Sequence, residues 1–327
     1  MPISIDVSQA QALLSTRADL LARGGTERGI RADLTAGSLI RIRRDQYAMS
    51  GPLDRLWPEG RHLVEVVAVH RSSATPGPVF WGPSAAVLHG LPLYRTTPKR
   101  VHTAILGTRR TRTRAGVTQH DVELPEEDIV EVGGIRCTSV DRTVLDLACT
   151  ASPEAAVAAA DAALRRECVR GHHHDREQAQ QWHARMAERA QRSRRHGIRR
   201  ARSLIAFADG RAELPGESVS RLVLHRLGFR EVQLQVPIRG SAGNRYWADF
   251  GFPGARVFGE FDGQGKYLDE ALRGKLTVEQ VVLQEKRRED DVRGVTGWRF
   301  ARWEDRHIRT IDRLGRQLAA FGLLPPG

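Results

Sequence analysis

Residues 245–262, RYWADFGFPGARVFGEFD, decide the fold of the C-terminal part of this 327-residue chain. Two alternating apolar runs flank Pro253-Gly254, a dipeptide typical of a turn, so the stretch predicts a β-hairpin. The surrounding sequence predicts a helix and a strand before the hairpin and a helix, a strand and a helix after it, at residues 214–229, 231–238, 277–297, 297–303 and 307–322. The order αβββαβα predicts an α+β domain over residues 213–327.

The position of the turn predicts which side chains share a face of the hairpin. If residues 251–254 close it, Asp249 lies opposite Phe258 on the neighbouring strand. Side chains two residues apart on one strand point to the same face, so Glu260 and Asp262 share the face of Asp249. The hairpin therefore predicts three carboxylates on one face, and a slip of one residue would separate Asp249 from the other two.

Carboxylates gathered in this way suit phosphodiester hydrolysis. This reaction needs a hard cation with oxygen ligands, and Asp249 and Glu260 are the expected ligands of Mg²⁺ or Mn²⁺, with Glu217 as a further ligand, directly or through water. It also needs a positive group to offset charge that develops on the phosphate, a role that fits Lys286 on the following helix or Lys266 after the hairpin. Simpler roles stay open, because Glu217 suits the N-terminus of its own helix and Lys286 has an acidic neighbour one turn on.

The run from Gly216 to Arg306 resembles the restriction-endonuclease-like superfamily, near its very-short-patch-repair branch. The resemblance is carried by ES at Glu217, ADF at Asp249, GEFDGQGKY from Glu260 and EKRREDDVRGVTGWRFARW from Glu285. It implies an αβββαβ nuclease fold, a metal site at the D…(E/Q)xK residues Asp249 and Glu260, and Mg²⁺-dependent cleavage of DNA. The lysine of that motif is Asp262 here. Because members of the superfamily also supply this lysine from the neighbouring helix, the resemblance points to Lys286.

Residues 1–50 predict two helices, one that ends at Gly24-Gly25 and one from Thr26 to Gly37, followed by a basic hairpin. Thr26 suits the N-cap of the second helix and Gly37 its C-terminal end, while the strand pair that follows turns at Arg44-Asp45. This order is typical of a winged helix-turn-helix, in which one helix enters the major groove of DNA and the wing contacts the backbone. A helical cap with a solvated arginine ribbon is the simpler alternative. The residues expected to contact DNA are Arg28, Arg31, Arg41, Arg43 and Arg44.

Most of the net charge of +12 lies in one segment. Residues 165–202 hold 12 basic and 4 acidic residues, and the pattern predicts a solvated, basic helical connector over residues 165–212, almost without a core face. A polyanion such as DNA is the natural partner of such a segment, because each neutralised phosphate releases a counterion. A solvated helical face is the alternative.

Residues 51–164 predict a mixed α/β domain with short motifs. The runs SAAVLHG, Ser84 to Gly90, and TSVDRTVLDLA, Thr138 to Ala148, are similar to runs in the AbiEi-like antitoxins of type IV toxin–antitoxin systems. In those proteins a winged helix-turn-helix precedes this domain. The resemblance implies an antitoxin or transcriptional regulator that binds DNA and a cognate toxin protein.

Composition excludes several classes of protein. No stretch approaches the roughly 20 continuous apolar residues of a membrane helix, and the first residues lack the basic and apolar regions of a signal peptide. The cysteines Cys137, Cys149 and Cys168 have no CxxC spacing, which argues against a disulfide framework or a zinc knuckle. We therefore expect a cytoplasmic protein without a membrane partner.

Two functions agree with these patterns. The first is a DNA-binding, AbiEi-like regulator with a Mg²⁺-dependent endonuclease-like C-terminal domain, which the pair Asp249 and Glu260 favours. The alternative is a non-enzymatic transcriptional repressor or antitoxin on an inactive nuclease fold, which Asp262 in place of lysine favours. A nucleotidyl-transfer fold in the middle domain ranks last, because that region has no GS-type phosphate loop with paired acidic residues.

Overall fold

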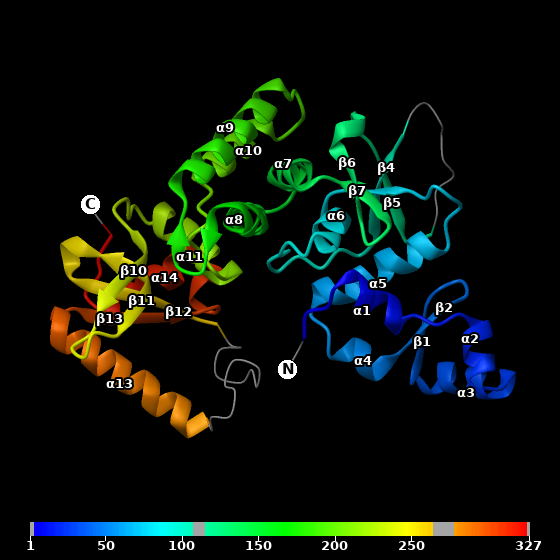
Figure 1. Ribbon diagram of the computed structural model, residues 1–327, viewed down its shortest axis with the longest axis horizontal. Helices are drawn as coiled ribbons and strands as arrows, with labels where there is room; N and C mark the ends of the chain where they lie inside the picture. The colour runs from blue at the N-terminus through cyan, green and yellow to red at the C-terminus, as the bar shows by residue number, and fades with distance from the viewer. Residues whose placement is uncertain (1–2, 107–114, 264–277, 326–327) are drawn as a thin grey trace. The chain divides into compact units, whose positions relative to one another are not determined.

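A computed structural model describes residues 3–106, 115–263 and 278–325 of the chain, which form a mixed α+β structure with several small sheets (Figure 1). The chain divides into two compact units. The N-terminal unit comprises Pro2–Ala159 and Met186–Ile205, and the C-terminal unit comprises Ala160–Arg185 and Ala206–Gly327. In the part of the chain that is described, no helix is both long and apolar enough to cross a membrane.

The N-terminal unit begins with three helices and a hairpin. The helix from Thr26 and the hairpin are confirmed, whereas the stretch before Gly24, which was expected to be one helix, forms two. The elements are α1 (Val7–Leu13), α2 (Arg17–Ala22), α3 (Glu27–Ala36), β1 (Leu39–Arg43) and β2 (Gln46–Met49). Thr26 caps α3 by accepting a hydrogen bond from the backbone N–H of Gly29 at 3.0 Å. Gly37 ends the helix in the left-handed conformation, with φ of 75°, where glycine carries no Cβ penalty. The pair Arg43–Gln46 leaves Arg44-Asp45 as the two-residue turn.

A five-stranded sheet with helices follows in the same unit. Its strand order is β5-β4-β3-β7-β6. The elements are α4 (Ser50–Asp54), α5 (Pro58–Arg71), β3 (Val79–Phe80), α6 (Pro83–Leu88), β4 (Val101–Ile105), β5 (Val117–Asp121), η1 (Glu126–Asp128), β6 (Ile129–Val132), β7 (Ile135–Thr138) and α7 (Val140–Thr150).

The two short motifs of this unit bind neighbouring elements together. Ser84 is fully buried; its Oγ accepts the backbone N–H of His102 at 2.8 Å and is hydrogen-bonded to His62 Nε2 at 2.9 Å. His89 Nε2 lies 2.7 Å from the carbonyl oxygen of Thr138 and thereby joins α6 to β7. Buried polar groups need such partners, so these motif residues hold the unit together.

The basic segment 165–202 buries apolar side chains, which corrects the prediction of a segment almost without a core face. It forms part of α8 (Pro153–Cys168), the short pair β8 (Val169–Arg170) and β9 (His173–His174), α9 (Arg176–Arg192) and part of α10 (Ile198–Phe207). Along α9, Trp182, Met186 and Ala190 are fully buried at a spacing of four residues. This spacing is helical, but the charged residues between these positions conceal it in the sequence.

Arginines of the same segment are paired with carboxylates inside each unit. In the N-terminal unit Arg189 lies 2.7 Å from Asp128, and Arg195 pairs with the buried Asp146. In the C-terminal unit Arg185 lies 2.7 Å from Glu167. Part of the charge excess therefore stabilises the fold, and only the remainder is available to a polyanion.

The C-terminal unit has the predicted order of elements, which confirms αβββαβα. The elements are α11 (Pro215–Arg226), β10 (Gln233–Arg239), β11 (Arg245–Phe252), η2 (Pro253–Ala255), β12 (Val257–Asp262), α13 (Val278–Thr296), β13 (Arg299–Glu304), η3 (His307–Arg309) and α14 (Ile311–Ala320). The strand order is β10-β11-β12-β13, with β12 and β13 parallel and the other pairs antiparallel.

The register of the hairpin differs from the prediction by two residues. Phe252 pairs with Val257, and the turn between them is a 3₁₀ turn followed by Arg256 at φ of 53°, instead of a tight turn at 251–254. A shift of two residues preserves which side chains share a face. The last recorded pair is Phe250 with Gly259. The next position along each strand is Asp249 and Glu260, so the predicted opposition of Asp249 and Phe258 is wrong.

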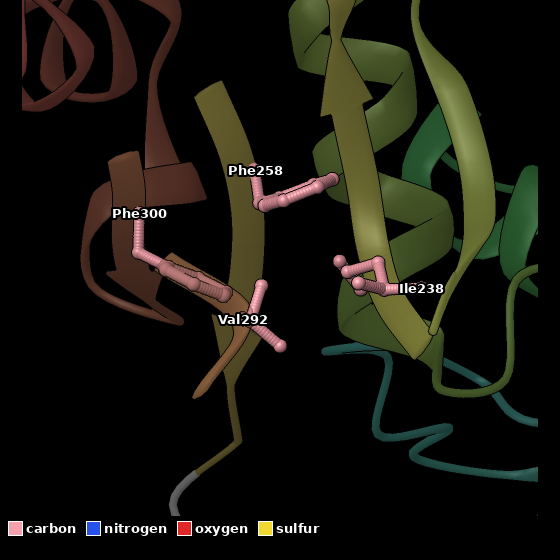
Figure 2. Close-up of a cluster of buried hydrophobic side chains, with 5 residues drawn as sticks. Ile238, Phe258, Val292 and Phe300 are labelled. Carbon is pink, nitrogen blue, oxygen red and sulfur yellow. The ribbon is translucent and has the colours of Figure 1, made fainter. Parts of the chain in front are cut away.

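The core of the C-terminal unit lies on both faces of this sheet. Val292 of α13 packs with Ile238, Phe258 and Phe300, as Figure 2 shows, so α13 covers one face. Trp303 lies three residues after Phe300 on β13, so its side chain points to the opposite face of the sheet. Its indole N–H donates a hydrogen bond to Ser220 Oγ of α11 at 2.8 Å. Helix α11 therefore covers the opposite face.

Gly259 tests this packing. A Cβ added there would lie 2.5 Å from Cη2 of the fully buried Trp303, whereas a Cβ at Gly254 would meet nothing within 4 Å. We expect Gly259→Ala to lower the free energy of unfolding by about 1–3 kcal/mol through overpacking, and Gly254→Ala to change it by less than about 0.5 kcal/mol. Urea unfolding measures both. Equal stabilities of the two variants would contradict the close approach of β12 to Trp303.

Candidate functional site

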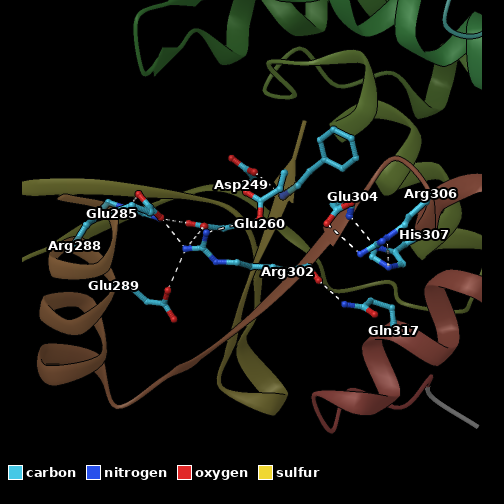
Figure 3. A network of polar contacts seen from close by, with 12 residues as sticks. Asp249, Glu260, Glu285, Arg288, Glu289, Arg302, Glu304, Arg306, His307 and Gln317 are labelled. Carbon is cyan, nitrogen blue, oxygen red and sulfur yellow. Dashed lines mark hydrogen bonds and ion pairs between the residues drawn. The ribbon is translucent and has the colours of Figure 1, made fainter. Parts of the chain in front are cut away.

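Glu260 is the buried centre of the candidate site. It lies on β12, only 5% of its surface is exposed, and its carboxylate is bound by Arg288 of α13 and by Arg302 of β13, the latter at 3.0 Å (Figure 3). Glu260 lies two residues after Phe258 on β12, so its side chain points to the face of the sheet that α13 covers. A buried carboxylate is costly unless it is paired, and here two guanidinium groups provide the pairing.

Arg302 of β13 connects the carboxylates of two further elements. Besides Glu260, its guanidinium lies 2.7 Å from Glu285 and 3.2 Å from Glu289 of α13, and 3.8 Å from Asp262 of β12. The guanidinium is planar and has five N–H donors, which suits several carboxylates at once better than an ammonium group does. These contacts fasten the crossover helix α13 to the two parallel strands that it joins.

Burial and the two arginines act in opposite directions on the pKa values of the acidic residues. Burial raises the pKa of Glu260, although Arg288 and Arg302 both act to lower it. Burial would also raise the pKa of Glu285, but hydrogen bonds from Arg288 and Arg302 outweigh it and lower this pKa to about 2. The carboxylate of Glu285 is therefore held as an anion by the two guanidinium groups.

Asp249 lies where the ladder between β11 and β12 opens. Its Oδ2 accepts the backbone N–H of Phe261 at 2.9 Å, beyond the last recorded backbone pair, Phe250 with Gly259. The side chain thus takes the place of a strand carbonyl as the acceptor. This brings Asp249 next to the strand position of Glu260, as Figure 3 shows.

Glu217 is occupied elsewhere, at the start of α11. It is buried, and its Oε2 accepts the backbone N–H of Glu213 at 2.8 Å and the side-chain N–H of Gln235 at 3.5 Å. Gln235 was not singled out in the sequence, yet it lies within β10 at φ of 49°, a conformation that non-glycine residues rarely adopt. Nothing in the local sequence indicates this conformation.

The arrangement suits arginine better than a divalent cation. Asp249 and Glu260 already accept hydrogen bonds from protein donors, and so does Glu217. Among the described residues, no group of three or more His, Cys, Asp or Glu side chains is placed to hold a metal ion. A Mg²⁺ or Mn²⁺ ion at Asp249 and Glu260 would compete with these donors, and its binding stays a prediction.

Among the described residues, arginines supply the positive charge next to Glu260. Lys286 is exposed on α13, and Lys266 lies outside the described residues. Arg288 and Arg302 reach Glu260 instead. The sequence did contain a signal for them, because lysine occurs at only four positions of a chain with 51 basic residues, so arginine is its usual cation.

The residues expected to contact DNA lie on α3 and on the β1–β2 hairpin. Arg28, Arg31, Arg41 and Arg44 are exposed, and Arg43 is partly buried. Arg41 Nε donates to the carbonyl of Arg43 at 3.3 Å. The capped helix and the hairpin thus carry these cations on two consecutive elements of one unit.

No family model matches this chain. It is 36% identical over 129 residues to the uncharacterized protein Rv2248 of Mycobacterium tuberculosis strain H37Rv, and equally to the uncharacterized protein MT2308 of strain CDC 1551. Each match covers 36% of this chain and 46% of the relative. The chain thus spans about half the length of the curated relatives it matches.

Arg302→Met tests the central ion pair. It removes the guanidinium but retains most of the aliphatic stem, and it leaves the buried Glu260 with Arg288 alone. We expect the free energy of unfolding to fall by about 3 kcal/mol. This is the lower end of the roughly 3–5 kcal/mol range for breaking a buried ion pair, because Arg288 still pairs with Glu260. The exposed Arg299→Met on the same strand should cost less than about 0.5 kcal/mol. A loss that is equal in both variants would contradict a special role for Arg302.

The pKa of Glu285 predicts acid sensitivity. Because this pKa is about 2 in the folded protein and 4.5 ordinarily, the contribution of Glu285 to stability is present above about pH 4.5 and is lost as the pH falls towards 2. The destabilisation caused by Glu285→Gln should therefore shrink between pH 7 and pH 3 in urea unfolding. Glu279→Gln, at an exposed position of α13, is the control. A cost of Glu285→Gln that stays constant with pH would count against the pairing.

Proposed function

We propose that this chain is a DNA-binding, AbiEi-like regulator whose C-terminal unit is a nuclease-like scaffold that does not cleave DNA. The observation that carries the second part is the engagement of Glu260 by Arg288 and Arg302. A carboxylate that must bind a catalytic cation has to offer free oxygen lone pairs. Here the cations are built into the protein, so the fold keeps the acidic residues as structural partners.

The DNA-binding part of the proposal rests on the front of the N-terminal unit. Three helices and a basic hairpin follow one another in the order of a winged helix-turn-helix. Arg28 and Arg31 on α3 suit base edges and phosphates of a major groove, and Arg41, Arg43 and Arg44 suit the backbone. A cognate toxin protein is a further partner that the AbiEi-like resemblance suggests.

A Mg²⁺-dependent endonuclease is the second candidate function. It is favoured by the adjacent strand positions of Asp249 and Glu260, the two residues that correspond to the metal ligands of the superfamily. It requires the arginines to leave Glu260 when metal and DNA bind, and a further positive group such as Lys266 or Lys286 to take part.

Binding and cleavage assays separate the two functions. We expect the purified chain to retard a DNA duplex with an affinity that falls as salt rises, and to leave supercoiled plasmid intact in Mg²⁺ or Mn²⁺. Arg44→Ala should weaken retardation of different sequences about equally and reduce the salt slope by about one. Arg313→Ala, at an exposed position of α14 in the C-terminal unit, is the matched control.

Two results would contradict the proposal. Metal-dependent nicking of plasmid that disappears in both Asp249→Ala and Glu260→Ala would establish the endonuclease. Duplex retardation that is absent, or that Arg44→Ala and Arg313→Ala weaken equally, would remove the assigned DNA surface.

A further inference from the structure

A cavity of about 410 Å³ opens between the turn of the β1–β2 hairpin and the C-terminal end of α5. Its volume lies in the range of about 300–1,000 Å³ that is usual for small-molecule sites. Every lining residue belongs to the N-terminal unit. These residues are Arg43, Arg44, Asp45, Gln46, Arg71 and Ser72.

The lining favours an anion. It contains three guanidinium groups and one carboxylate, that of Asp45. Oδ1 of Asp45 accepts the backbone N–H of Arg17 at 2.9 Å, so this carboxylate also serves the first turn of α2. A concave surface with an excess of positive charge concentrates anions, and guanidinium groups match the geometry of phosphate oxygens.

Two of the arginines are held in place by the fold. Arg43 Nη1 donates to the carbonyl of Ala115 at 3.2 Å, and Arg71 Nη1 donates to the carbonyl of Leu14 at 3.3 Å. These contacts come from separate parts of the N-terminal unit, so each of the two cations is held by its own backbone carbonyl. Because these side chains are positioned before a ligand binds, less side-chain conformational entropy is lost on binding.

Gln46 lines the cavity and has an unsatisfied acceptor. Only 6% of this residue is exposed, and its Oε1 has no hydrogen-bond partner among the described residues. A buried acceptor without a donor is unfavourable and marks a place where a donor is missing. The phosphodiester backbone of DNA offers acceptors there, whereas a sugar or a phosphate monoester also offers O–H groups.

We propose that this cavity binds the phosphoryl group of a small phosphorylated molecule that also carries a hydroxyl donor, such as a mononucleotide. Arg43, Arg44 and Arg71 bind the phosphoryl oxygens, and Gln46 accepts a hydrogen bond from the hydroxyl. Because Arg43 and Arg44 also belong to the DNA surface, the ligand competes with a backbone phosphate for them. This competition rests on the proposed function, whereas the site itself does not.

Isothermal titration calorimetry tests the site with deoxyadenosine 5′-monophosphate and with inorganic phosphate. We expect one molecule of nucleotide to bind per chain, with a Kd that rises at least tenfold in Arg71→Gln. Arg55→Gln, which removes an exposed arginine outside the lining, should leave the Kd unchanged. Gln46→Met should also raise the Kd of the nucleotide. Circular dichroism of each variant distinguishes a lost site from a lost fold.

A second arm identifies the source of the phosphoryl group. The nucleotide should weaken retardation of a duplex by the wild-type chain and have little effect on retardation by the Arg71→Gln variant. If neither nucleotide nor phosphate binds but Arg71→Gln weakens duplex retardation, the phosphoryl group is that of DNA and the small-molecule site is overturned. If Arg71→Gln changes nothing, the cavity is not an anion site, although duplex binding by the wild type still supports the proposed function. Nucleotide binding by a chain that binds no duplex would support the site and overturn the proposed function.

Discussion

Arg302 joins β12, α13 and β13 of the C-terminal unit at Glu260, where the sequence predicts a metal site. Its guanidinium lies among carboxylates of β12 and α13, while its own strand, β13, runs parallel to β12. A parallel pair needs a crossover, and α13 is that crossover. The charged contacts of Glu285 and Glu289 and, about one turn later on α13, the apolar packing of Val292 with Phe258 and Phe300 fasten this helix to the sheet. The acidic residues can therefore gather without a metal ion.

The same use of arginine recurs in the N-terminal unit. Arg142 is almost fully buried and lies 2.9 Å from Asp128 and 3.1 Å from Asp146, and helix α9 adds Arg189 to Asp128. Burial raises the pKa of Asp146 to about 7, with Arg142 acting in the opposite direction. Such pairs do more for the specificity of packing than for net stability, since desolvation offsets much of their attraction. A basic chain can thus place many of its arginines inside its own fold.

Local signals predicted the elements, and tertiary contacts decided the rest. Thr26, Gly37 and the turn at Arg44-Asp45 act within a few residues, so the sequence was sufficient to place them. The dipeptide Pro253-Gly254 predicted a turn but not its length, because a 3₁₀ turn and a left-handed Arg256 accommodate two further residues. The shared face of Glu260 and its neighbours followed from alternation. Their pairing with Arg302, 42 positions further on, depends on the crossover and had no local signal.

A metal-binding measurement tests directly whether Arg288 and Arg302 take the place of a divalent metal ion at Glu260. Electron paramagnetic resonance of Mn²⁺ titrated with the protein measures bound metal without any need for catalysis. The wild-type chain should leave millimolar Mn²⁺ free, and Glu260→Gln should give the same spectrum. One Mn²⁺ bound per wild-type chain at micromolar concentration, and lost in Glu260→Gln, would contradict the account.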